Sequence, residues 1–78
     1  MKYSINIEKN NMANNTGRET EKWEDVVNLL KNGLTFDTRK VRIFKYSSDE
    51  KLVAQKDVTM GNIFEVANSA SDEILNRR

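Results

Sequence analysis

Few side chains in this sequence could support catalysis. It contains no histidine and no cysteine, so the imidazole that titrates near neutral pH and the thiol nucleophile are both missing. Carboxylates could still act as a pair. However, Glu21, Glu24 and Asp25 fall within one turn of a predicted helix, where solvation and the helix dipole explain acidic residues. The same explanation covers Asp72 and Glu73, and the sequence therefore predicts a protein that is not an enzyme and needs neither a cofactor nor a metal ion.

Length and composition point to one small binding domain. The chain has 78 residues and a net charge of +1, and residues 1–30 hold no apolar run typical of a signal peptide. No segment is apolar enough to cross a membrane, so we expect a cytoplasmic protein without membrane contact. The composition is rich in asparagine and free of proline, which indicates an AT-rich gene and favours a phage or mobile-element product.

The first half of the chain predicts a strand, a loop and a helix. Residues 2–8 alternate between apolar and polar side chains, as expected of a half-buried strand. Residues 10–18 form a polar, asparagine-rich loop. Apolar residues then recur at helical spacing from Thr20 to Lys31, with Thr20 as the predicted cap. Gly33 is expected to end this helix in a left-handed conformation.

The second half predicts a hairpin and a second helix. Residues 40–46 and 52–58 form the strands, and a single helix runs from about residue 59 or 61 to residue 77. Its apolar stripe includes Met60 and Phe64. The predicted fold is a two-layer α+β domain of order β-α-β-β-α, a three-stranded sheet with two helices on one face. If the first two strands are neighbours, they should be parallel.

The favoured function is binding to a larger protein, as an inhibitor or adaptor. The predicted contacts lie in the polar loop and at the acidic start of the first helix. They are Asn11, Asn14, Asn15, Arg18, Glu21, Glu24 and Asp25. An inserted loop and a solvated helical turn would explain the same residues without any partner.

The alternative is nucleic-acid binding by the sheet. Lys40, Arg42, Phe44 and Tyr46 alternate onto one face of the predicted strand, with Lys51 nearby. Aromatic rings on an open sheet can stack bases while cations contact phosphates. The near-neutral net charge counts against this function, because dedicated nucleic-acid binders tend to be basic. A homodimer formed through the stripe of the last helix is a further alternative.

Overall fold

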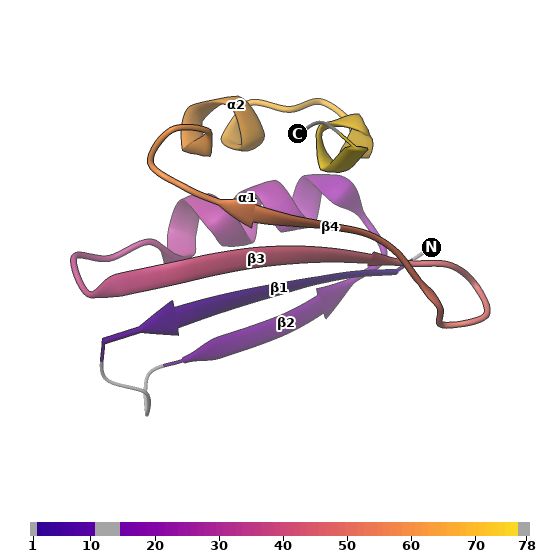
Figure 1. Cartoon of the computed structure of the whole chain (residues 1–78), viewed down its shortest axis with the longest axis horizontal. Helices are drawn as coiled ribbons and strands as arrows, with labels where there is room; N and C mark the ends of the chain where they lie inside the picture. The colour runs from indigo at the N-terminus through magenta and orange to yellow at the C-terminus, as the bar shows by residue number, and fades with distance from the viewer. Residues whose placement is uncertain (1, 11–14, 77–78) are drawn as a thin grey trace.

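The computed structural model describes residues 2–10 and 15–76. Its elements in chain order are β1 (Lys2–Lys9), β2 (Thr16–Thr20), α1 (Trp23–Gly33), β3 (Thr38–Tyr46), β4 (Leu52–Val58), α2 (Ile63–Ala67) and the 3₁₀ helix η2 (Asp72–Asn76). The strands form one antiparallel sheet in the order β2-β1-β3-β4. The helical segments α1, α2 and η2 all lie on one side of this sheet, and no described helix covers its other side (Figure 1). The two-layer α+β class is therefore confirmed.

β1 is half-buried, as its alternating sequence predicts, and the structure places it between β2 and β3. Tyr3, Ile5 and Ile7 are buried beneath the helices, while Ser4 and Asn6 lie on the opposite face of the strand. The buried face of the sheet packs against α1, whose own buried residues recur at helical spacing. Because side chains alternate along each strand, one row of apolar residues is enough to define the core side.

The predicted three-stranded sheet is wrong, because a fourth strand begins within the predicted loop and extends past it to Thr20. β2 covers residues 16–20 and pairs with β1 along its whole length. Its sequence Thr-Gly-Arg-Glu-Thr has no apolar alternation, since it is an edge strand whose residues 17–19 are exposed. Backbone hydrogen bonds to β1 create this strand, and they leave no hydrophobic pattern in the sequence. Residues 11–14 of the predicted loop lie outside the described residues.

The predicted parallel pairing is also wrong. β3 is the neighbour of β1, but the two strands run antiparallel. The β1–β2 hairpin reverses the chain before α1 begins, so the α1 connection joins β2 to β3 and spans β1. β2 and β3 are both antiparallel to β1 and are therefore parallel to each other.

Both ends of α1 differ from the prediction. The helix begins at Trp23 instead of Thr20, because Thr20 is the last residue of β2. The Thr20 hydroxyl accepts a hydrogen bond from the Lys22 backbone N–H (3.2 Å) and donates to the Asp25 carboxylate (3.0 Å), so it stabilises the entry to the helix without capping it. Gly33 ends the helix without a left-handed conformation. A Cβ at this position would overlap the Cδ1 atom of Ile7, so the glycine permits a close approach to β1.

The predicted last helix is broken into two short pieces. α2 ends at Ala67 and η2 begins at Asp72. The Asn68 side-chain amide donates to the Phe64 carbonyl (2.8 Å), and the Ser69 hydroxyl donates to the Glu65 carbonyl (2.7 Å). Side chains of this kind compete with the backbone for carbonyls that a continuing helix would use. The break leaves the Ser69 carbonyl free to accept from the Trp23 indole N–H (3.2 Å).

The predicted apolar stripe of this region is only partly correct. Ile74 and Leu75 are buried in the core, but Met60 and Phe64 are 91% and 80% exposed, and Val66, which the predicted stripe does not include, is buried instead. Met60 precedes α2 in a turn, and the break after α2 changes which residues face the sheet. No helix within the described ranges is both long and apolar enough to cross a membrane.

Candidate binding surfaces

A buried lysine closes the C-terminal end of α1. The Lys9 ammonium donates to the Gly33 carbonyl (2.6 Å) and to the hydroxyls of Thr35 (2.6 Å) and Thr38 (2.9 Å). These three bonds match the three protons of the ammonium, and the positive charge lies where the helix dipole is negative. All of its hydrogen-bonding capacity is therefore used to join β1, α1 and β3.

A second polar cluster fastens η2 to the sheet. The Tyr3 hydroxyl donates to the Asp72 carboxylate at 2.7 Å, and the Lys45 ammonium pairs with the same oxygen at 2.5 Å. Burial, together with the Asp72 carboxylate, raises the pKa of Tyr3 to about 12. The hydrogen bonds from Lys45 and Tyr3 hold the pKa of Asp72 below its usual value. At neutral pH Tyr3 is therefore neutral and can donate its hydrogen bond, and Asp72 is charged and can accept it.

The predicted nucleic-acid residues share the uncovered side of the sheet. Lys40, Arg42, Phe44 and Tyr46 alternate with the buried residues of β3, and we call this side the open face. The Phe44 and Tyr46 rings stack at a centroid distance of 6.5 Å and an angle of 29°. Lys51 lies apart from them at the start of the hairpin's second strand, where it pairs with Asp49 at 3.8 Å.

Acidic neighbours pair with two cations of the open face, Lys2 and Arg42. Arg42 pairs with Asp57 of β4 at 3.4 Å. Lys2, whose ammonium lies 5.9 Å from the centre of the Tyr46 ring, is within 3.7 Å of a Glu19 oxygen. Lys40 lies opposite Glu8 in the register between β3 and β1, but no ion pair joins it to a carboxylate of the described residues. The open face is therefore aromatic with partly paired charges, and its described residues present no continuous row of unpaired cations to phosphate.

The predicted protein-binding residues do not form one site. Asn11 and Asn14 lie outside the described residues. The Asn15 side chain accepts a hydrogen bond from the Lys9 backbone N–H at 2.7 Å, which indicates a structural role in the β1–β2 hairpin. Arg18 and Asp25 line the same shallow hollow between β2 and α1.

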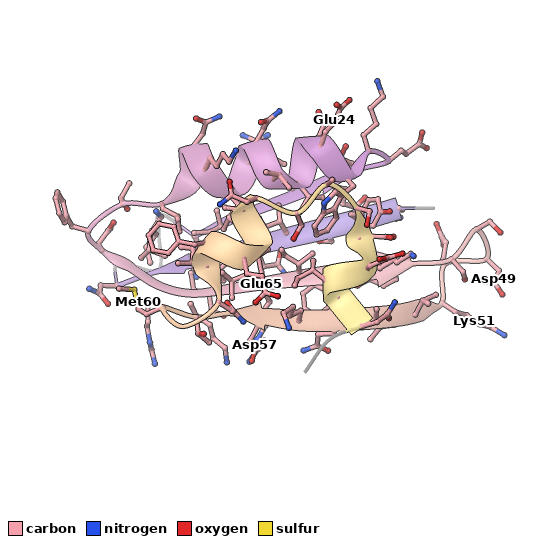
Figure 2. The ribbon with its side chains drawn as sticks, turned by 90° about the horizontal axis from the view of Figure 1, so that it is seen from above. Glu24, Asp49, Lys51, Asp57, Met60 and Glu65 are labelled. Atoms are coloured by element: carbon pink, nitrogen blue, oxygen red, sulfur yellow. The ribbon has the colours of Figure 1, made fainter. Side chains whose placement is uncertain are left out.

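The remaining two acidic candidates are exposed but lie outside that hollow. Glu24 is on the exposed side of α1, and Glu21 lines a separate depression with Lys2 and the β3–β4 turn. Seen from above, Glu24 lies at the outer edge of α1, on the side away from α2 and η2 (Figure 2). Solvation accounts for both residues, although only Glu24 lies in the first turn of α1, because the helix begins at Trp23 and not before Glu21 as predicted.

A further surface was not predicted from the sequence. A hollow of about 430 Å³ lies between residues 34–41 and residues 58–63, and we call it the end hollow. Its walls include the apolar side chains Leu34, Val41, Val58 and Ile63, and the exposed Phe36 and Met60 stand at its margin. Met60 lies at the opposite end of the molecule from Asp49 and Lys51 (Figure 2). The available sequence signal was Phe36, an aromatic residue between a helix and a strand among polar neighbours.

The candidate surfaces must be interpreted from their own geometry. No protein-family model matches this chain, and no curated protein or solved structure is detectably similar to it. Within the described ranges, no three acidic side chains are grouped closely enough to hold a metal ion. The two surfaces that stand out are the open face and the end hollow, and both are suited to contact with another molecule.

Proposed function

We propose that this chain is a non-catalytic protein-binding module whose contact surface is the end hollow. The observation that carries the proposal is the exposure of large apolar side chains around an apolar depression. Phe36 is fully exposed and Met60 is 91% exposed, although the domain has few large apolar residues to spare from its core. Contiguous apolar surface of this kind is characteristic of interaction sites.

The chemistry of the end hollow favours a protein as the partner. Protein interfaces combine an apolar centre, enriched in Phe and Met, with a polar rim. The end hollow has this arrangement, because apolar walls are bordered by Thr35, Thr38 and Thr59. Within this proposal the chain acts as an inhibitor or adaptor of a larger host macromolecule. The phage or mobile-element origin and the cytoplasmic location stay predictions from composition.

The proposal can be tested by comparative capture from cells of the source organism. We would immobilise the native chain, the Phe36→Ser/Met60→Ser double variant and a Leu52→Ser/Val53→Ser control. Leu52 and Val53 are also exposed, at 53% and 54%, but they lie in β4 outside the end hollow. The substituted side chains are exposed, so each variant should keep its unfolding free energy within about 0.5 kcal/mol.

The expected result is a stoichiometric protein that the native chain and the control retain and the double variant loses. If the native chain retains no stoichiometric protein, or if the double variant retains it as well as the native chain does, the proposal is wrong. Crosslinking before capture would keep a weak complex from being lost during washing.

The second candidate function, nucleic-acid binding, is favoured by the stacked Phe44 and Tyr46 rings on the open face. Fluorescence anisotropy of labelled single-stranded DNA and RNA, titrated across a salt series, would test it. Binding that weakens with salt and in Arg42→Ala and Phe44→Ala, but not in the Lys22→Ala control on the helical side, would support this function. Absence of binding at low salt would exclude it.

A further inference from the structure

The end hollow has an unusual electrostatic border. Among the described residues, Arg39 and Lys40 are the only charged ones that line it, and both are cations. In the described part of the chain neither forms an ion pair, whereas Lys2, Arg42, Lys45 and Lys51 each have a carboxylate within 4 Å. The apolar depression is therefore bordered by positive charge that the protein itself leaves without an ion-pair partner.

An irregularity in the sheet brings Arg39 to this border. Glu8 pairs with Lys40 and Lys9 pairs with Thr38, so Arg39 is an extra residue of β3 with no partner in β1. A bulge of this kind redirects side chains and is common beside functional sites. The Arg39 side chain is exposed although its neighbour Val41 is 3% exposed and belongs to the core.

We propose that the occupant of the end hollow is an acidic segment of a partner protein that inserts a large apolar side chain between Phe36 and Met60. This inference rests on the proposed protein-binding function and deepens it by naming the chemistry of the partner. The apolar side chain would be buried against Val41, Val58 and Ile63. Carboxylates beside it would meet the Arg39 guanidinium and the Lys40 ammonium, and Arg39 can hold a carboxylate with two parallel hydrogen bonds.

Physical arguments assign separate roles to these two kinds of contact. Burial of the apolar side chain supplies most of the affinity, since exposed ion pairs contribute little. Charge complementarity selects the partner and speeds the encounter, because a basic segment would bring like charges together. Replacing both cations by glutamate should therefore change which segment is preferred, while a segment with an apolar side chain still binds.

The test uses three short synthetic peptides and the full chain labelled with ¹⁵N. One peptide has a central leucine–phenylalanine pair flanked by glutamates. The second has lysines in place of the glutamates, and the third has serines in place of the apolar pair. Binding is followed by backbone amide shifts at residues 34–41 and 58–63, in the native chain and in an Arg39→Glu/Lys40→Glu variant. Lys22→Glu/Lys31→Glu, which changes two exposed cations of the helical layer, is the control.

For the native chain we expect the acidic peptide to bind about tenfold more tightly than the basic peptide at low salt, with the difference shrinking as salt is added. The Arg39→Glu/Lys40→Glu variant should reverse this preference, and the control should preserve it. Replacement of the apolar pair by serine should abolish the amide shifts around the end hollow.

The outcomes separate this inference from the function on which it rests. Equal binding of acidic and basic peptides at the end hollow would show that the partner segment need not be acidic. It would not contradict the protein-binding function. No shift around the end hollow with the acidic peptide would likewise overturn the inference. The capture experiment with Phe36→Ser/Met60→Ser would still decide the function by itself. Retention of the captured protein by that double variant would overturn both.

Discussion

The Lys9 ammonium donates a 2.6 Å hydrogen bond to the carbonyl of Gly33, so a side chain of β1 closes the C-terminal end of α1. Lys9 is only 7% exposed, which is rare for lysine unless its donors are satisfied. The bond joins residues that are far apart in the sequence and gives a carbonyl at the end of α1 a partner without a left-handed residue.

Lys9→Met should destabilise the protein by about 1–3 kcal/mol, because it removes three hydrogen bonds and leaves the Gly33 carbonyl without a partner. Methionine keeps the apolar stem, so lost packing contributes little. Urea unfolding would measure the change, with Lys31→Met as the control for an exposed lysine in the last turn of α1. Equal stabilities of Lys9→Met and the native chain would show that the buried ammonium has no stabilising role.

Gly33→Ala should destabilise the protein by about 1–3 kcal/mol because the new methyl overlaps Cδ1 of Ile7 in a packed core. Ile7→Val removes that carbon, so the double variant should lose much less stability than the two single variants combined. Thermal unfolding of all four proteins gives the coupling free energy. Additive effects would show that the close approach of Gly33 and Ile7 is not what requires glycine.

Asp72 should make the protein sensitive to acid. Its pKa is lowered in the folded state by Lys45 and Tyr3, so its contribution to stability is present above the unfolded pKa of about 4. That contribution is lost as the pH falls through the folded pKa. Asp72→Asn should be less stable than the native chain at neutral pH, and the difference should shrink below about pH 4. Unfolding measured across this range would show the convergence, with Glu73→Gln as the control at an exposed carboxylate of the same short helix.

Tyr3 should produce the opposite dependence at alkaline pH. Its folded pKa of about 12 exceeds the unfolded value of 10.0, so the folded state holds the proton more tightly. The resulting stability is present below the unfolded pKa and is lost as the pH rises toward the folded pKa. Tyr3→Phe should reduce stability at neutral pH by about 1 kcal/mol and should flatten the alkaline loss. Tyr46→Phe on the open face is the matched control, and an equal flattening in that variant would contradict the assignment.

The sequence predicted the elements whose pattern is local. The alternation of Tyr3, Ile5 and Ile7 identified β1 and its buried face. The helical spacing of Trp23, Val26, Val27 and Leu30 identified α1, and the structure confirms that all four are buried. The hairpin of β3 and β4 was predicted to within two residues at each end, because its polar turn interrupts two apolar runs.

The candidate sites were predicted less well than the elements. Lys40, Arg42, Phe44 and Tyr46 do share one face, as strand alternation requires. Their acidic neighbours come from other strands, however, so the charge balance of that face was not apparent in the sequence. The end hollow was missed because its two walls come from segments that are distant in the chain. The assignment of Met60 to a core stripe also assumed a continuous last helix, which the structure does not contain.

By itself the sequence determined the α+β class, the half-buried strand β1, the first helix and the hairpin, since short-range periodicity indicates which side of an element is buried. Only the tertiary structure decided the edge strand β2, the antiparallel order and the ends of α1. It also decided the break after α2 and the shape of the end hollow. These features depend on contacts such as Lys9 with Gly33 and Trp23 with Ser69, which join residues far apart in the chain. A hydrophobic pattern does not predict such contacts, because they are made by single polar groups and backbone atoms.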